Sequence, residues 1–277
     1  MLPAFLIMLR EGLEAALIVG IIAGYLARTG RQAWLPTVWI GVLLAVALSL
    51  FVGAAVLAVG SQFPQKLQEL FEAIIGALAV IILISMVFWM RKAARSIKKT
   101  VEHDIDVALA DAHGPTWALI GMSFFAVARE GLESVFFLLA IFQQSPGPAA
   151  PIGALLGIAA AVVLGYGIYR GGVRLDLRRF FLWTGIFIIF VAAGLAASVL
   201  RSLHEAGIWN HLQQPVWDLS RTLPVSSILG TVLSALFGYH ETPVLGEVLV
   251  WAIVLGVSLF FFLRPQRPAA EPARQEV

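Results

Sequence analysis

Long runs of apolar residues alternate with short polar segments along the chain of 277 residues. Several runs reach or exceed the roughly 20 residues that an α-helix needs to cross the hydrocarbon layer of a bilayer. The pattern therefore predicts an all-α polytopic membrane protein with about seven transmembrane helices. We expect the spans at residues 2–27, 36–59, 68–90, 116–143, 150–170, 179–201 and 243–263.

The segment at residues 202–242 departs from this pattern. It contains the mixed sequence HEAGIWNHLQQPVWDLSRTLP, followed by a shorter apolar run, SSILGTVLSALFGYH. Because that run is short for a span, we interpret the segment as extracytoplasmic or re-entrant, and the sequence alone leaves both readings open. The last residues, 264–277, are polar and rich in proline, which predicts a disordered cytoplasmic tail.

The basic residues of the loops predict how the chain is oriented. If the N-terminus lies outside, then Lys66, Arg201 and Arg221 are the only loop arginines and lysines on the outer side. All the others, including the cluster at 91–99, then lie in the cytoplasm, as the positive-inside rule requires. We therefore expect a multi-pass protein of the cytoplasmic (inner) membrane with its N-terminus outside and its C-terminus in the cytoplasm.

Composition supports the membrane assignment and excludes several function classes. Residues are 60% hydrophobic and 13% charged, whereas about a quarter of the residues in a soluble domain are charged. The net charge of +2 comes from basic residues in loops, which is an orientation signal and does not indicate nucleic-acid binding. The chain has no cysteine, which excludes disulfides, thiolate metal sites and iron–sulfur clusters.

Two nearly identical charged motifs interrupt otherwise apolar spans. LREGLEAAL occupies residues 9–17 in the first span, and AREGLESVF occupies residues 128–136 in the fourth. Because three spans separate them, the second motif runs through the membrane in the opposite direction. This predicts a 3 + 3 inverted repeat with one additional helix. The expected units are a first repeat at 1–90, a cytoplasmic loop at 91–115, a second repeat at 116–201 and a seventh helix at 243–263.

Each motif brings acidic and basic side chains together on one helix face. Its two glutamates are three residues apart, and its arginine precedes the second glutamate by four, so all three are neighbours on a helix. If the two helices pack together, four carboxylates and two guanidiniums meet near the bilayer midplane. The candidate metal ligands are Glu11, Glu14, Glu130 and Glu133, with Arg10 and Arg129 as the motif arginines.

The cost of burying these charges indicates what they do. A charged side chain at the bilayer centre costs about 2.5–3.5 kcal/mol, so these groups must face a protein interior or a wet cavity. Two arginines cannot neutralise four carboxylates, and protons or a bound cation must relieve the excess. Carboxylate oxygens suit hard cations such as iron, manganese, magnesium and calcium. Gly12 and Gly131 would allow close helix approach or access for an ion.

Two other interpretations of the motifs remain open. Each arginine–glutamate pair could be a structural salt bridge, although this leaves one glutamate of each motif unpaired. The glutamates could also form a proton relay, alone or together with metal transport. An enzyme is disfavoured, because the Glu-x-x-His spacing of a di-iron oxidase is missing from both spans.

Further polar residues are candidates for the route of an ion. The possible entry path comprises Glu72, His204, Glu205, His211, His240 and Glu241, which we expect on the outer side. Histidines at a membrane boundary are alternatively interface anchors. The possible cytoplasmic exit comprises Glu102, His103, Asp104 and Asp106, which could instead form a solvated helix that balances the preceding basic cluster. Glu247 lies within the last span and needs a partner that the sequence does not identify.

The motif regions resemble a known family. LREGLEAALIVG and FFAVAREGLESVFFLLA are similar to the two Arg-Glu-x-x-Glu motifs of the high-affinity, oxidase-linked iron permease family, and MVFWMRKAARSIK resembles its bacterial branch. The resemblance implies iron uptake that requires the glutamates of both motifs, with iron as substrate and no permanently bound cofactor. It also implies a periplasmic cupredoxin-like protein and a haem peroxidase as partners. A transporter of another divalent cation such as manganese, or a membrane oxidoreductase subunit, is the alternative, and the carboxylates accept either Fe²⁺ or Fe³⁺.

Overall fold

The computed structural model describes residues 1–60, 64–93, 97–110, 114–144, 147–169 and 176–264, and these residues are mostly helical. The expected tail lies outside them from residue 265 onward. All seven expected spans are confirmed as helices, within a few residues at each end. The helices are α1 (Leu2–Arg28), η1 (Gln32–Trp34), α2 (Leu35–Gly60), α3 (Gln65–Ala93), α4 (Ile97–Ala110), α5 (Pro115–Gln144), α6 (Ala149–Tyr169), α7 (Leu177–Glu205), α8 (Ile228–Phe237) and α9 (Leu245–Leu263).

Most of the long helices have the composition of membrane spans. Helices α2, α3, α6, α7 and α9 are long and apolar enough to cross a bilayer. Helices α1 and α5 have 27 and 30 residues, which is also sufficient, but each carries the three charges of its motif. The chain is thus an all-α polytopic membrane protein, as its sequence predicted.

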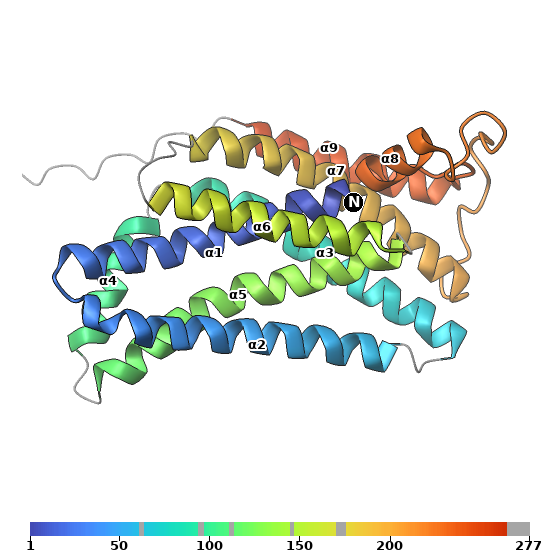
Figure 1. Ribbon diagram of the computed structural model, residues 1–277. Coiled ribbons are helices and arrows are strands. Elements are labelled where there is room, and N and C mark those ends of the chain that lie inside the picture. Colours follow the sequence, from blue (N-terminus) through green and yellow to red (C-terminus); the bar gives the residue numbers. More distant parts are fainter. Residues whose placement is uncertain (61–63, 94–96, 111–113, 145–146, 170–175, 265–277) are drawn as a thin grey trace, which may run out of the picture.

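The long helices lie side by side, and the short helices mark the two ends of the bundle (Figure 1). Helix α4 lies at one end, which we call the α4 end, and α8 lies at the opposite end, which we call the α8 end (Figure 1). Helices α1 and α5 run in opposite directions, as expected for two motifs that are separated by three spans (Figure 1).

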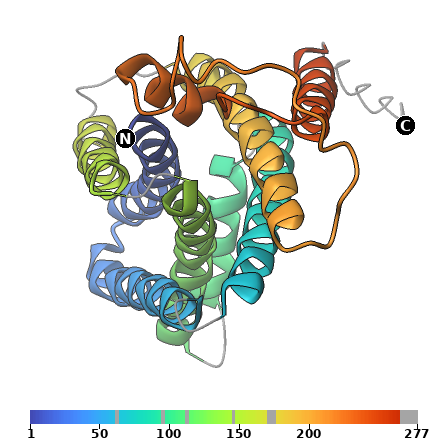
Figure 2. The ribbon, with the colours of Figure 1, turned by 90° about the vertical axis from the view of Figure 1, so that its right-hand side faces the viewer.

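The helices pack in pairs that join the two halves of the chain. Helix α1 packs on α6, α2 on α5, α3 on α7, and α7 on α9, while α1 also contacts α5 (Figure 2). Small residues allow the closest approaches. A Cβ atom added to Gly12 would lie 2.6 Å from the Cβ of Ala161 in α6, and one added to Gly131 would collide with the hydroxyl of Ser49 in α2. The expected close approach at both motif glycines is therefore confirmed.

Helix α8 is too short to be an eighth span. Its 10 residues cover about 15 Å, half of the roughly 30 Å hydrocarbon layer. The hydroxyl of Ser227 accepts a hydrogen bond from the backbone N–H of Gly230 and caps the start of the helix. Gly238 ends it in the left-handed conformation, with φ of 70°, and its backbone lies directly against Gly194 of α7. The absence of side chains at these two glycines therefore allows the end of α8 to pack directly on α7.

The structure identifies the partner of Glu247. Its carboxylate is 5% exposed and accepts two hydrogen bonds from the Arg201 guanidinium, at 3.0 Å from Nε and 2.8 Å from Nη2. This bidentate pair joins α9 to the end of α7.

We expect Arg201→Gln to destabilise the protein by about 3 kcal/mol, because it leaves the buried Glu247 carboxylate unpaired. The double variant Arg201→Gln/Glu247→Gln should recover most of this loss, since two amides can hydrogen-bond each other. Thermal unfolding of the purified protein in detergent measures both effects. Equal losses in the single and double variants would show that the ion pair is not what stabilises this contact.

Candidate functional site

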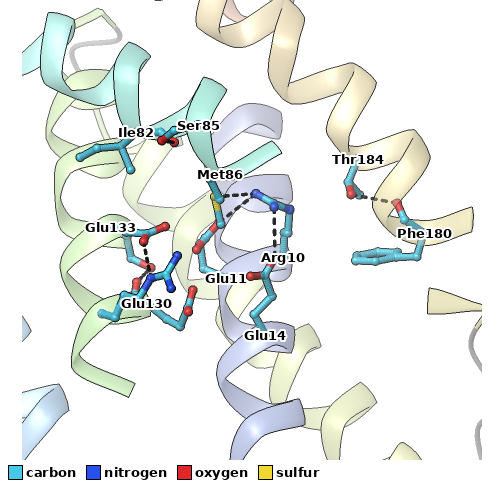
Figure 3. A network of polar contacts seen from close by, with 12 residues as sticks. Arg10, Glu11, Glu14, Ile82, Ser85, Met86, Glu130, Glu133, Phe180 and Thr184 are labelled. Atoms are coloured by element: carbon cyan, nitrogen blue, oxygen red, sulfur yellow. Dashed lines mark hydrogen bonds and ion pairs between the residues drawn. The ribbon is translucent and has the colours of Figure 1, made fainter. Parts of the chain in front are cut away.

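Three motif carboxylates converge inside the bundle. One oxygen each of Glu11, Glu14 and Glu130 lies within 4.8 Å of the others. Glu11 and Glu14 come from α1 and Glu130 from α5, and the three residues are 1%, 4% and 5% exposed (Figure 3). We call these three residues the carboxylate centre. Oxygens at this separation can coordinate one ion together.

Arg10 supplies the positive charge of the carboxylate centre. It is 1% exposed, its Nη1 lies 3.3 Å from Glu11 Oε1, and its Nη2 lies 3.1 Å from Glu14 Oε1. The expected contact between positions i and i+4 of the first motif is thus present. Nη1 also donates a hydrogen bond of 2.9 Å to the sulfur of Met86 in α3, a contact that the motif pattern did not predict (Figure 3).

The second motif is arranged differently from the first. Arg129 Nε lies 3.0 Å from Glu133 Oε1, so the expected pair four residues apart is again present. The Arg129 side chain is 47% exposed, however, and its guanidinium stacks on the Trp89 ring with 4.3 Å to the ring centroid. Glu133 stays with Arg129 and is not one of the three residues whose oxygens lie within 4.8 Å. Three carboxylates therefore converge where the sequence led us to expect four.

Every motif glutamate keeps one buried oxygen without a hydrogen-bond partner among the described residues. These atoms are Glu11 Oε2, Glu14 Oε1, Glu130 Oε2 and Glu133 Oε2, and Arg10 Nε is also unpartnered. Glu14 Oε1 is close to Arg10, but the two groups are not aligned for a hydrogen bond. Buried polar groups are almost always satisfied, because leaving one unpaired costs about 1–3 kcal/mol or more. Protons or a cation would complete the coordination that the chain leaves open.

Two pockets lie near the carboxylate centre, one directly beside it and one toward the α8 end. An apolar pocket of about 430 Å³ lies between α1, α2, α5 and α6, and Glu11 and Glu130 form part of its wall. A more polar pocket of about 240 Å³, here called the outer pocket, lies at the α8 end. It is lined by Glu69, Glu72 and Glu205, among other residues.

One face of α3 connects the outer pocket with the carboxylate centre. Glu72, Gly76, Ala79, Leu83 and Met86 follow one another at spacings of three and four, which places them on one side of the helix. Glu72 and Gly76 line the outer pocket, and Met86 contacts Arg10. Met86 follows Glu72 by 14 positions, which on a helix is about 21 Å. Ala79 and Leu83 are fully buried between them, in an apolar layer that also contains Phe137 of α5.

Comparison with known proteins assigns the family. The family model described as Iron permease FTR1 family matches residues 1–266. The chain belongs to the FTR1 iron permease family. It is 55% identical to the ferrous iron permease EfeU of Escherichia coli O157:H7 over 274 residues, which is 99% of both chains. It is also 55% identical to the ferrous iron permease EfeU of Yersinia pestis over 273 residues, which is 99% of this chain and 97% of that one. No solved structure matches the chain.

The FTR1 assignment makes the chain an iron transporter and not an enzyme, as the motifs predicted. It confirms the resemblance noted in the sequence, and it confirms that iron is the ion concerned.

The residues considered for the entry path of this permease divide into two groups. Glu72 and Glu205 line the outer pocket. Glu69, which is not one of the candidates from the sequence, lines it too. Of the remaining candidates, His211 packs its ring edge-on against Trp209, and the other three contact backbone groups of the segment between α7 and α9. His204 Nε2 lies 3.2 Å from the His211 carbonyl, His240 Nδ1 accepts from the Thr242 N–H, and Glu241 accepts from the Val225 N–H at 2.8 Å.

The residues considered for the cytoplasmic exit lie on α4, at the α4 end. Glu102 pairs with Arg28 at 2.7 Å, and Asp106 pairs with Arg31 at 3.4 Å. His103 and Asp104 are exposed. This arrangement is typical of a solvated helix held to the bundle by surface ion pairs, which was the alternative reading.

We expect Gly12→Ala to destabilise the FTR1 permease by about 1–3 kcal/mol, because the added methyl group overlaps Ala161 and pushes α1 away from α6. Gly20 is a matched control on the same helix, since a Cβ added there has no neighbour within 4 Å. Gly20→Ala should be neutral or slightly stabilising, because alanine favours helix. Thermal unfolding of both variants provides the measurement, and equal stability of the two would contradict the close-packing account.

Proposed function

We propose that the chain imports iron across the cytoplasmic membrane through the carboxylate centre. Glu11, Glu14 and Glu130 bind the ion, and Glu133 joins them as a fourth ligand during passage. The observation that carries this proposal is the unpartnered buried oxygen on each of these glutamates. Since the similar EfeU proteins are named ferrous iron permeases, we propose Fe²⁺ as the transported ion.

The route begins at the outer pocket. Its glutamates attract cations from the outer solution, and the α3 face leads from this pocket to the carboxylate centre. The apolar layer of Ala79, Leu83 and Phe137 closes the route between them. Iron therefore crosses only when this layer opens, which would prevent a continuous leak.

The arrangement of the helices supports two inverted repeats, α1–α3 and α5–α7, with α9 as the additional helix. The first helix of each repeat packs on the second helix of the other, and the two third helices pack together. A two-fold axis in the membrane plane gives this exchange of partners. The axis would pass between the two motifs, near the midplane, and movement of one repeat against the other would open the site to alternate sides.

The two arginines have different roles in this proposal. Arg10 lies among the carboxylates and limits the negative charge of the centre when no ion is bound. Arg129 holds Glu133 aside and is itself exposed, so it can release this fourth ligand when iron arrives. If the motif glutamates formed only structural salt bridges with the arginines, their unpartnered oxygens would have no role.

The same route fits the orientation of the chain in the membrane and the partners that we expect for it. With the N-terminus outside, the α8 end faces the periplasm and the α4 end faces the cytoplasm. A periplasmic cupredoxin-like protein and a haem peroxidase, which the family resemblance implies, would then deliver iron at the α8 end, beside the outer pocket.

Transport can be tested with purified protein in vesicles that contain an iron-sensitive dye. Fe²⁺ added outside under anaerobic conditions should quench the dye faster than in empty vesicles. Equal rates would contradict transport and would favour an oxidoreductase subunit. Excess Mn²⁺ in the same assay tests the manganese alternative, and a pH gradient tests whether protons move with iron or are the only ions that move.

A further inference from the structure

The sulfur atom of Met86 is in direct contact with a motif residue, Arg10. Its side chain is 3% exposed, and its Sδ accepts the hydrogen bond from Arg10 Nη1 at 2.9 Å. The same Nη1 lies 3.3 Å from Glu11 Oε1. A positively charged nitrogen thus contacts both a carboxylate oxygen and a thioether sulfur (Figure 3).

This position is one that a metal ion could take over. The guanidinium of Arg10 does not use all its donors, since its Nε has no hydrogen-bond partner among the described residues and its Nη2 is not aligned with Glu14. An incoming cation would compete with Nη1 for Glu11 and would find the Met86 sulfur next to it. A site made only of carboxylates suits magnesium, calcium and manganese, whereas a thioether favours softer transition metals.

We propose that Met86 is a metal ligand that gives the carboxylate centre its preference for Fe²⁺ over harder divalent cations. The proposal rests on the proposed function, because it assigns the ion specificity of the same centre. When Fe²⁺ binds, Arg10 Nη1 moves away from Glu11 and Met86, and the ion bonds to the Glu11 oxygen and to the Met86 sulfur.

Two variants of Met86 distinguish a role in metal binding from a role in positioning Arg10. Met86→Leu removes the sulfur at nearly constant volume. Met86→Gln replaces it with an amide oxygen, which still accepts a hydrogen bond from Arg10 but is a hard ligand. Met90→Leu is the matched control, since Met90 lies one turn further along α3, is 4% exposed and belongs to the same apolar cluster.

The first measurement is Fe²⁺ uptake into vesicles with Mn²⁺ or Mg²⁺ as competitor. We expect Met86→Leu and Met86→Gln to lower the preference for Fe²⁺ over Mn²⁺ by roughly fivefold or more, while Met90→Leu keeps it. If Met86 only positions Arg10, then Met86→Leu slows the uptake of every ion equally, Met86→Gln restores it, and the preference is unchanged. That outcome would overturn the proposal.

The second measurement is X-ray absorption at the iron edge of the Fe²⁺-loaded wild-type protein. A sulfur neighbour of the iron should be present in the wild type and in Met90→Leu, and absent in Met86→Leu. Iron surrounded only by oxygen in the wild type would refute the ligand role even if the protein transports iron. Failure of the wild type to transport any iron would instead refute the proposed function.

Discussion

Glutamine in place of Glu11 or Glu130 should lower iron uptake by roughly 100-fold or more, because each change removes a charged ligand from the carboxylate centre. The protein should still be present in the membrane in normal amounts. The amide has nearly the shape of the carboxylate, and it removes a negative charge from a site that has more carboxylates than arginines. Dye-loaded vesicles give the uptake rate, and immunoblotting of membranes gives the amount of protein.

Glu102→Gln is the control for this experiment. Glu102 is also a glutamate paired with an arginine, but the pair is partly exposed at the α4 end, far from the carboxylate centre along α1. We expect near-normal uptake from it. Full uptake by the double variant Glu14→Gln/Glu133→Gln would show that the motif glutamates do not carry the ion.

Arg10→Gln should destabilise the protein by about 3–5 kcal/mol, because it leaves two buried carboxylates without their positive neighbour. Arg129→Gln should cost less, since Arg129 is paired with Glu133 alone and its side chain is 47% exposed. Both motif arginines begin the same sequence, REGLE, so a difference between them would reflect what surrounds each of them in the fold. Thermal unfolding in detergent measures it.

A rescue experiment tests the cause of the Arg10 effect. Arg10→Gln/Glu14→Gln removes one of the two carboxylates together with the arginine, and it should recover a large part of the lost stability. Equal destabilisation by Arg10→Gln and Arg129→Gln, without rescue, would mean that Arg10 does not act as the counter-charge of the centre.

The sequence predicted those features that depend on helix geometry alone. The apolar runs gave the positions of the long helices, because a membrane-spanning segment must be apolar over a fixed length. The pairs of Arg10 with Glu14 and of Arg129 with Glu133 follow from the spacing of four. Gly12, which has no side chain, correctly predicted a close approach of two helices. The sequence did not identify the residue that it contacts, Ala161.

Features that depend on how each helix is rotated could not be predicted. Both motifs contain REGLE, yet Arg10 is 1% exposed while the Arg129 side chain is 47% exposed, because α1 and α5 present their motifs to different neighbours. Only the packing of α3 shows that Met86 contacts Arg10. The spacing from Glu72 to Met86 along α3 was the one signal that could have placed them on a common face.

Residues in the segment at 202–242 show a second limit of the sequence. Histidines and acids are common metal ligands, and their number before the last span suggested an entry path. In the structure, His204, His240 and Glu241 bind backbone groups of the same segment and stabilise its turns. Composition cannot distinguish these two uses, because both require the same donor and acceptor atoms.

The central claim is that iron occupies the carboxylate centre. Anomalous diffraction at the iron edge, from crystals of the protein equilibrated with Fe²⁺ without oxygen, locates the ion directly. The account predicts a peak among Glu11, Glu14 and Glu130, with Arg10 displaced from Glu11. A peak in the outer pocket alone, with Glu11 and Glu14 still beside Arg10 and Glu133 still beside Arg129, would contradict it.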